Sequence, residues 1–443
     1  MTPRPYTVLF PFCGLGAGAL GFLQAATDEA RFVSLGGIDL DPLACEDFER
    51  LTGSPAWCAD VLQVTPDALR ARYGTAGPDV VFLSPPCQAA SGLLSASKAA
   101  TPAYQRLNEL AYVWTVLMLA AWRPRLVLLE NVPRLPSRAP EMLARVRDML
   151  REAGYEVSEG YHDCGVVGGL AQHRRRYLMV ARLRATTGHY LYEPPAQRVL
   201  GCGEVLSALP VPLPGVEGEA GPMHRLPNLS WLNWVRLALI PAGGDWRDLD
   251  AAVNGLPGNV DDPRVSNAYP HSYGVLGWQQ PSHTVSGTTS VGCGAYAVAD
   301  VRLGCEPRAG AYGVMGWEDA AGTITGSANL DNGRFSVADP RRPPPSPVVI
   351  VAKDGTWHRP LTTLELALLQ GLPPTLDGRP LVLSGGTTVQ RKHIGNAVPV
   401  GAARAIAGQM LRTLAASDQG GMFLSASRIW VAPSRAVTMG VGL

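Results

Sequence analysis

Residues 7–26 read TVLFPFCGLGAGALGFLQAA, an apolar run followed by closely spaced glycines and then by a stretch rich in alanine and leucine. A strand, a glycine-rich turn and a helix in this order are typical of the first unit of a doubly wound α/β sheet. Glycines in such a turn let the backbone bend sharply and approach a ligand, while helix N–H groups point at it. This stretch therefore predicts the fold class and the position of a ligand site.

The alternation of apolar runs and amphipathic stretches continues to about residue 185. Further strand-like runs lie at residues 32–40, 78–86, 125–132 and 176–183. Helix-like stretches lie at residues 107–122 and 141–153, and Gly154 stands in a C-cap position after the second of them. We therefore expect an α/β domain with a doubly wound, mostly parallel, Rossmann-like sheet flanked by helices.

From about residue 190 the sequence changes to Gly, Pro, Ser and Thr with short alternating apolar runs, which predicts a smaller, β-rich region. A unit within it is duplicated without a gap, because the landmarks of residues 273–300, such as YGVLGW, recur in residues 312–339. Two copies are fewer than a solenoid needs, so we interpret them as paired β-hairpin units. The expected division is a first part of the α/β domain at 1–189, the β-rich region at 190–350, a return to the α/β domain at 351–416, and an unassigned tail at 417–443.

The chain has 443 residues, of which 46% are hydrophobic and 17% charged, and this predicts a soluble globular protein. The net charge of +1 excludes the global basic excess of many nucleic-acid-binding proteins, so local clusters would have to hold such a partner. The apolar runs are strand-sized and the N-terminus lacks the features of a signal peptide, so we expect a cytoplasmic protein without membrane spans. The eight cysteines include no C-x-x-C pair, and we expect no metal site.

Acidic residues end two of the expected strands. Asp39 comes about 20 residues after the glycine-rich turn, and a carboxylate at this position can accept both hydroxyls of a ribose. Asp60 follows a third short strand and is placed to receive an adenine amino group. Together with the glycines they favour a nucleoside ligand over ordinary turns. Their spacing does not distinguish a dinucleotide from S-adenosylmethionine.

Two further strand ends carry reactive side chains. Cys87 follows Pro85 and Pro86, and a rigidly presented thiol beside basic groups can act as a nucleophile, although a buried structural cysteine is the usual alternative. Glu130 follows the run RLVLL and is suited to share a proton with a heterocycle nitrogen, the alternative being a charge at a helix N-terminus. Both positions fall in the same row of strand ends as Asp39, so we expect them to face one site.

Two polar segments complete the pattern. Arg174, Arg175 and Arg176 precede the strand-like run YLMVARL, so the first and third share one face and the second lies on the other. One face can reach a carboxylate or a base oxygen and the other a phosphate, whereas a solvated basic run is the alternative. Gly395 and Asn396 precede the last helix-like stretch, where they either cap that helix or place an amide near a cofactor.

In this order and spacing, the segments resemble the C5-cytosine-specific DNA methyltransferase family over residues 7–185 and 355–412. The resemblance implies a class I methyltransferase fold with S-adenosylmethionine as cofactor. It implies methyl transfer to C5 of a cytosine flipped out of double-stranded DNA within a specific short sequence. Residues 190–350 occupy the place of the family's target-recognition domain.

The resemblance also assigns roles to individual residues. It implies Cys87 as the nucleophile that adds to C6 of the base, Glu130 as the acid that contacts the base, and Arg174 and Arg176 as supporting cations. It implies cofactor contacts by Phe12, Gly14, Gly16, Gly18, Asp39, Asp60, Pro86, Asn396 and Val398.

The chain departs from the family pattern at two places. Phe10 and Pro11 stand where an acidic residue and a leucine usually precede the motif phenylalanine, and Ala89 and Ala90 follow Pro-Cys-Gln where the family has Gly-Phe. Two alternatives therefore stay open: a tRNA cytosine-5 methyltransferase and a catalytically silent nucleic-acid-binding protein. A nucleotide-dependent oxidoreductase would explain only the glycine-rich turn and Asp39.

Charge is unevenly distributed along the chain. Residues 190–350 contain ten arginines and fifteen acidic residues, a net charge of −5, so the rest of the chain carries +6. We therefore expect the α/β part to attract DNA phosphates and the loops of the duplicated unit to read bases. The expected DNA contacts are Gln88, Ser91, Gln172, Arg175, Ser286, Thr288, Ser327, Asn329, Arg391 and Lys392. We expect the protein to be a monomer. The protein partner that we consider is a restriction endonuclease that acts on the same DNA site.

Overall fold

The computed structural model of the chain describes residues 3–86, 101–187, 190–212, 218–240, 242–243, 248, 273–287, 289–300, 314–315, 336–337, 350, 352, 356–420 and 424–432. Six of the expected site residues lie outside these ranges: Cys87, Gln88, Ser91, Thr288, Ser327 and Asn329.

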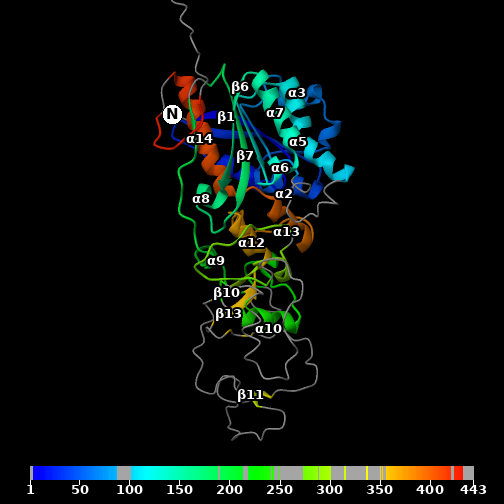
Figure 1. Cartoon of the computed structure of the whole chain (residues 1–443), viewed down its shortest axis with the longest axis vertical. Coiled ribbons are helices and arrows are strands. Elements are labelled where there is room, and N and C mark those ends of the chain that lie inside the picture. The colour runs from blue at the N-terminus through cyan, green and yellow to red at the C-terminus, as the bar shows by residue number, and fades with distance from the viewer. Residues whose placement is uncertain are drawn as a thin grey trace, which may run out of the picture.

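A seven-stranded sheet with the strand order β3-β2-β1-β4-β5-β7-β6 forms the centre of the α/β part (Figure 1). Its strands are β1 (Arg4–Pro11), β2 (Ala30–Asp39), β3 (Ala56–Cys58), β4 (Val80–Leu83), β5 (Leu126–Asn131), β6 (Tyr155–Asp163) and β7 (Arg175–Leu183). Strands β1 to β5 are parallel, and β7 runs antiparallel to both β5 and β6, so the expected mostly parallel sheet is confirmed. The chain changes winding direction at β1, and doubly wound sheets bind ligands at such a switch point.

Helices cover both faces of this sheet because alternate residues of each strand point to opposite sides. In β4, for example, Val80 and Phe82 belong to one core, and Val81 and Leu83 to the other. One face carries α1 (Ala17–Gln24), α8 (Cys164–Gly168) and α14 (Val400–Gln419), and the other carries α3 (Pro66–Tyr73), α5 (Pro102–Ala121) and α7 (Pro140–Glu152) (Figure 1). Two further helices are α2 (Pro42–Thr52) and α6 (Leu135–Arg138). The helices expected at 107–122 and 141–153 are thus α5 and α7.

Several strands were not expected from the sequence, and two of them belong to the α/β part. One is β6, which is mostly half-buried and whose sequence, YEVSEGYHD, contains no continuous apolar run. The other is β16 (Ile429–Val431), which lies in the unassigned tail and pairs antiparallel with β8 (Leu191–Tyr192). Trp430 and Val431 join the core formed with α14, so this part of the tail belongs to the α/β domain.

The second region is joined to the α/β part through strand pairing and a common core. Its elements include α9 (Cys202–Leu206), α10 (Trp231–Leu239), β9 (Val275–Leu276), β10 (Ala297–Asp300), β13 (Trp357–Pro360), α12 (Thr363–Leu369), β14 (Thr375–Leu376) and β15 (Arg379–Pro380). Strand β13 pairs antiparallel with β10, so the returning segment begins in the sheet of the second region and not directly in the α/β domain. Leu15 and Ala17 share a core cluster with residues of α9, β10 and α12.

The duplicated unit contains the same strand pair twice. Val275 and Leu276 of β9 pair in parallel with Ala297 and Val298 of β10. Strand β11 (Val314–Met315) pairs in parallel with β12 (Ser336–Val337). Each of these strands stands one repeat length after its counterpart in the first copy, β9 or β10. The rest of residues 312–339 lies outside the described residues. The β-hairpin interpretation is wrong, because hairpin strands are antiparallel.

The segment before the last helix forms a helix of its own, α13 (Thr387–Asn396). Gly395 and Asn396 therefore end α13, and the expectation that they cap α14 is wrong, since Pro399 stands at the N-cap of α14. A Cβ atom on Gly395 would overlap the backbone of Ser286, so glycine allows the second region to cross α13 closely. Within the described ranges, every helix is too short or too polar to cross a bilayer.

Candidate functional site

A cavity of about 690 Å³ opens at the carboxyl edge of the sheet. Residues at the ends of β1 to β5 line it, together with the end of α13. The expected catalytic and cofactor-binding residues in its lining are Phe12, Gly14, Gly16, Gly18, Asp39, Asp60, Pro86, Glu130, Arg174, Arg176, Asn396 and Val398. Sites for small ligands typically have volumes of about 300–1,000 Å³. The structure thus brings residues from separate strand ends into one ligand-sized space.

The turn after β1 has a left-handed backbone at Phe12, Gly14 and Gly16, with φ angles of 55°, 52° and 94°. This conformation costs little at glycine but is unfavourable for a bulky residue such as Phe12, and strained residues of this kind cluster at functional sites. The Phe12 ring packs edge-on against Trp114, with ring centroids 6.4 Å apart. A Cβ atom on Gly14 would meet no atom within 4 Å, so Gly14 faces open space in the cavity.

Gly18 has a packing function in addition to its place in the cavity lining. A Cβ atom on Gly18 would lie 2.6 Å from Phe82 and 3.5 Å from Val398. The missing side chain lets α1 approach both β4 and the segment after α13. The expected cofactor contacts Gly18 and Val398 therefore lie against each other at one wall of the cavity.

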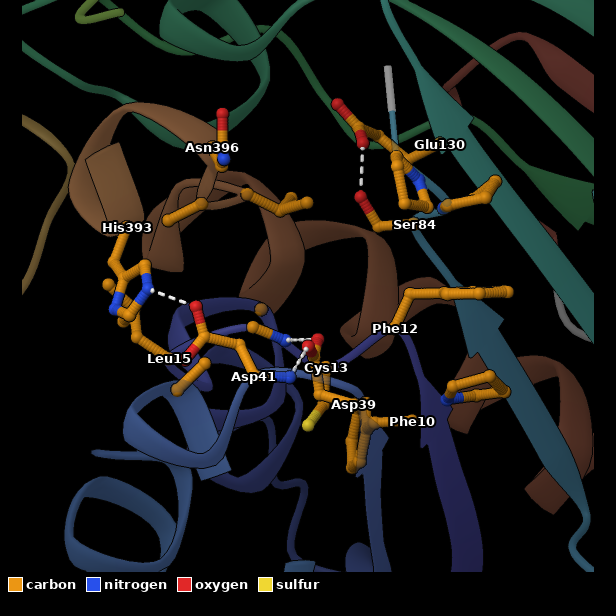
Figure 2. A pocket seen from close by; sticks show the side chains of 18 of the residues that line it. Phe10, Phe12, Cys13, Leu15, Asp39, Asp41, Ser84, Glu130, His393 and Asn396 are labelled. Atoms are coloured by element: carbon orange, nitrogen blue, oxygen red, sulfur yellow. Dashed lines mark hydrogen bonds and ion pairs between the residues drawn. The ribbon is translucent and has the colours of Figure 1, made fainter. Parts of the chain in front are cut away.

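The carboxylate of Asp39 holds the glycine-rich turn in place. Its Oδ2 accepts the N–H of Gly14 at 2.8 Å and its Oδ1 accepts the N–H of Asp41 at 3.0 Å (Figure 2). Leu40 lies between the two acids and is 67% exposed although it is apolar. Asp60 accepts the N–H of Leu62 at 3.0 Å and lines the same cavity. A fixed carboxylate beside an exposed apolar side chain suits a nucleoside, and sequence reasoning missed Leu40.

The side chains of Asp41 and His393 contact each other at the cavity, and the sequence did not predict this contact. Oδ1 of Asp41 accepts the N–H of Leu43 at the start of α2, and Oδ2 lies 3.0 Å from His393 Nε2 (Figure 2). Burial disfavours both charged forms, yet the neighbouring carboxylates of Asp47 and Asp41 raise the pKa of His393 above its ordinary value. The interaction with His393 lowers the pKa of Asp41.

The carboxylate of Glu130 is bound at both oxygens. Oε2 accepts the hydroxyl of Ser84 at 2.7 Å (Figure 2). Oε1 lies 2.9 Å from Nε of Arg176. Glu130 and Arg176 are both buried. Two fixed partners hold the acid in one orientation at the cavity wall, where it can bind a ligand nitrogen.

Asn131 fixes the chain directly before Cys87. Its buried Nδ2 donates to the carbonyl of Pro85 at 3.0 Å. The segment that leads to Cys87 is thus tied to the end of β5, beside Glu130. Cys87 itself lies outside the described residues.

The three consecutive arginines have different environments, and the expected alternation of faces is confirmed. Arg174 and Arg176 are buried, whereas Arg175 is exposed with its guanidinium 4.7 Å from the centroid of the Tyr161 ring. Arg174 donates to the carbonyls of Val285, Gly395 and Ala397 at 2.8, 2.9 and 3.0 Å. Arg176 therefore orients Glu130, while Arg174 joins the second region and the end of α13 to the sheet.

Gln172, expected to contact DNA, is a buried structural residue. Its Nε2 donates to the carbonyl of Leu369 at 2.9 Å, and its Oε1 accepts the N–H of Val285 at 3.0 Å. With no exposed surface, Gln172 is inaccessible to DNA in this structure, so the expected contact is not supported.

Three other expected DNA contacts are engaged within the protein. Arg391 donates to Thr363 Oγ1 and to the carbonyls of Thr289 and Leu361. Lys392 lines the cavity, with Nζ 3.9 Å from Asp41 Oδ2. Ser286 Oγ lies 2.6 Å from the hydroxyl of Tyr296. These contacts place Arg391 and Ser286 in the packing between α13 and the second region.

A buried ion cluster joins the returning segment to the first copy of the duplicated unit. The guanidinium of Arg359 lies 3.0 Å from Asp300 Oδ2 and 2.8 Å from Glu365 Oε1, and all three side chains are fully buried. Glu365 also accepts the N–H of Thr362 at the start of α12. Burial disfavours the charged forms, but the pairing raises the pKa of Arg359 and lowers that of Glu365.

Comparison with known proteins gives matches in sequence. The family model of the C-5 cytosine-specific DNA methylases matches residues 8–198 and 312–412. The type II methylase M.HgiDII of Herpetosiphon aurantiacus is 24% identical over 279 residues, which are 62% of this chain and 74% of that protein. The type II methyltransferase M.XorII of Xanthomonas oryzae is 28% identical over 195 residues, which are 43% of each protein.

The fold also matches solved structures. The methyltransferase EhMeth of Entamoeba histolytica aligns with a TM-score of 0.54 at 13% identity, over 94% of this chain and 99% of that one. The fold is that of the class I methyltransferases, with a large, mostly parallel sheet and flanking helices. The family match covers more than half of the chain, and the chain therefore belongs to the C-5 cytosine-specific DNA methylase family.

Proposed function

We propose that the chain is a DNA (cytosine-5-)-methyltransferase that uses S-adenosylmethionine and acts at a specific short sequence in double-stranded DNA. The observation that carries the proposal is the buried pair of Glu130 and Arg176, which shares one cavity with the Gly14 turn and Asp39. An acid suited to a base and a turn suited to a nucleoside thus lie within one ligand-sized space.

Cys87 is the proposed nucleophile. Its thiolate adds to C6 of cytosine, the C6–S bond forms, and the electron pair of the C5–C6 double bond moves to C5. When bound, the cofactor supplies an electrophilic methyl group on a sulfonium. C5 would take that methyl group while the methyl–sulfur bond breaks and its electron pair stays on the cofactor sulfur, which leaves as a neutral thioether. A water molecule would then accept the C5 proton, and the electron pair of that C–H bond would re-form the C5–C6 double bond as the C6–S bond breaks and releases the Cys87 thiolate.

Glu130 supports this addition from the other side of the base. Donation of a proton or a hydrogen bond to N3 draws charge into the ring and makes C6 more electrophilic. Arg176 and Ser84 hold the carboxyl group for this task, each by one of its oxygens. Arg176 is also placed to contact the base oxygen O2.

The residues around the cavity fit the cofactor. Gly14 leaves room for close approach of the ligand, and the exposed side chain of Leu40 offers an apolar surface for an adenine ring. Asp39 would accept the ribose hydroxyls, and Asp60 would accept the adenine amino group. Asn396 would lie near the carboxylate of the cofactor.

The target cytosine must leave the base stack to reach this cavity. We infer that residues 190–350 recognise the sequence around it, with polar loops of the duplicated unit as base readers. The exposed Arg175, which stands between the cavity-lining Arg174 and Arg176 in sequence, is the phosphate contact that we favour. The names of the two type II relatives support a role beside a restriction endonuclease that cuts the same sequence.

The proposal is tested by incubating the purified protein with unmethylated DNA and S-adenosylmethionine and sequencing the modified cytosines at single-base resolution. C5-methylcytosine within one short motif is the expected result. Cys87→Ser should abolish transfer while cofactor binding is retained, and retained transfer would contradict the assigned nucleophile. A parallel reaction with tRNA separates the two substrates, because methylated tRNA with unmodified DNA would overturn the proposal.

A further inference from the structure

The imidazole of His393 lies between two carboxylates, those of Asp41 and Asp47. Its Nε2 is 3.0 Å from Asp41 Oδ2 and its Nδ1 is 3.9 Å from Asp47 Oδ2. His393 belongs to α13, whereas Asp41 is the N-cap of α2 and Asp47 lies within that helix. The imidazole is 5% exposed and Asp47 is fully buried. One buried ring therefore connects α13 to α2.

Among the charged groups around the ring of His393, the carboxylates of Asp41 and Asp47 are the two that face it. Arg50 binds Oδ1 of Asp47, and the backbone N–H of Ser384 donates to the same oxygen at 2.9 Å. Oδ2 of Asp47 is buried, has no hydrogen-bond partner among the described residues, and lies 3.9 Å from His393 Nδ1. Lys392, on α13 itself, lies 3.9 Å from Asp41 Oδ2. Helix α12, which packs against α13, carries one charged residue, Glu365, and Arg359 binds its carboxylate.

Asp41 connects His393 to the residues expected to hold the ribose. The N–H of Asp41 donates to Asp39 Oδ1, and Asp39 Oδ2 accepts the N–H of Gly14. A displacement of Asp41 would therefore move Asp39, the Gly14 turn and the exposed Leu40 between the two acids. The same ring belongs to the helix whose end, at Gly395 and Asn396, lines the cavity from the other side.

We propose that His393 is a positioning residue for the cofactor, which holds the Asp39–Asp41 turn against α13 and so sets the affinity for S-adenosylmethionine. The inference rests on the proposed function, because it assigns this cavity to that cofactor. Charge-assisted hydrogen bonds between fixed elements are suited to such a role because they are strong and directional.

The protonation of His393 gives this role a pH dependence. Burial opposes the imidazolium, but the carboxylates of Asp47 and Asp41 raise the pKa of His393 above its ordinary 6.5. The charged interaction is then fully present below pH 6.5 and is lost as the pH rises through the raised pKa of the folded state. We therefore expect cofactor affinity to fall as the pH rises through that raised pKa.

The test measures binding of S-adenosylhomocysteine to the full chain by calorimetry, from about pH 6 to about pH 9. In His393→Gln the amide can still donate to Asp41, but the positive charge is gone. We expect its Kd at the low end of this range to rise about tenfold, as for the loss of one charge-assisted hydrogen bond, and the pH dependence of the wild type to disappear. The same variant controls for titration of S-adenosylhomocysteine, because a pH dependence that comes from the ligand itself would remain in His393→Gln.

Asp41→Asn tests the same contact from the other side, because asparagine retains an oxygen that caps α2. Its Kd should rise as in His393→Gln, and the double variant should bind no more weakly than either single variant, since both remove one interaction. At saturating cofactor, all three should methylate DNA at the wild-type kcat with a raised KM for the cofactor.

The matched control is His358→Gln, which replaces a buried histidine that contacts a backbone carbonyl and a hydroxyl. His358 contacts the carbonyl of Leu237 at 2.8 Å and Thr356 Oγ1 at 2.9 Å, in the second region. We expect lower thermal stability with an unchanged cofactor Kd. Wild-type affinity in His393→Gln at every pH would overturn the inference, as would additive losses in the double variant. Failure of the wild type itself to bind S-adenosylhomocysteine would instead contradict the proposed function.

Discussion

Arg176 and Glu130 lie 2.9 Å apart, Nε to Oε1, on the antiparallel neighbours β7 and β5. The register of this strand pair brings the start of β7 beside the end of β5, because Asn131 pairs with Tyr177. The reversed direction of β7 thus places a cation next to the acid at the cavity. Ser84 at the end of β4 completes the arrangement from the parallel side.

Replacing Arg176 with lysine should separate orientation from charge. Lysine keeps the positive charge but presents no planar guanidinium to Glu130. We expect kcat for methylation to fall about 100-fold, within the range for groups that assist proton transfer, while the Kd of the cofactor is unchanged. Single-turnover kinetics and calorimetry measure the two quantities. An equal loss in both would show that Arg176 acts on the whole cavity and not on Glu130.

Replacing Arg359 with methionine should lower the free energy of unfolding of the chain. The carboxylates of Asp300 and Glu365 would stay buried without their cation, and breaking a buried pair in this way costs about 3–5 kcal/mol. Urea denaturation of the purified variant measures the change. Arg198→Met is the control, because the Arg198–Glu204 pair is exposed and its loss should leave the midpoint near that of the wild type. Similar midpoints for the two variants would contradict the structural role of the cluster.

Gly395→Ala should loosen the contact between α13 and the second region. The added Cβ would overlap the backbone of Ser286, and such overpacking costs about 1–3 kcal/mol. Gly408→Ala is the matched control, because a Cβ there meets no atom within 4 Å inside α14. Alanine in a helix interior is favoured over glycine by about 0.5–1 kcal/mol, so thermal melts should shift in opposite directions. Parallel shifts would refute the close approach at Gly395.

Arg175 and Arg391 should differ in their effect on DNA binding. Arg175 is exposed, whereas three oxygens of the protein hold Arg391. We expect Arg175→Ala to weaken binding to all DNA sequences and to reduce the slope of log K against log salt by about 1. Arg391→Ala should lower stability and leave that slope unchanged. Fluorescence anisotropy at several salt concentrations measures both, and the reverse pattern would assign the phosphate contact to Arg391.

The fold and the place of the cavity could be predicted from local sequence. Apolar runs ended by Gly14, Asp39 or Glu130 fix both the strands and the edge at which these residues meet, because parallel strands end on one side of a sheet. The alternation of Arg174, Arg175 and Arg176 could be predicted for the same reason, since it depends only on strand geometry.

Contacts between distant segments could not be predicted in this way. Gln172 looks like a polar surface residue until Leu369 and Val285 are known to surround it. His393 and Asp41 are separated by most of the chain, and neither stands in a pattern of its own. Strand β10 pairs both with β9 and with β13, and β13 stands much later in the sequence.

The matching registers of β9–β10 and β11–β12 bear on how this protein can evolve. The first copy of the unit supplies Val285 and Asp300, which bind Arg174 and Arg359, so its sequence is constrained by folding. The second copy repeats the strand pair while the first already makes these contacts. A unit whose strand pair recurs at the same register gives the chain two copies of one framework, so sequence changes in one copy leave the framework of the other copy intact.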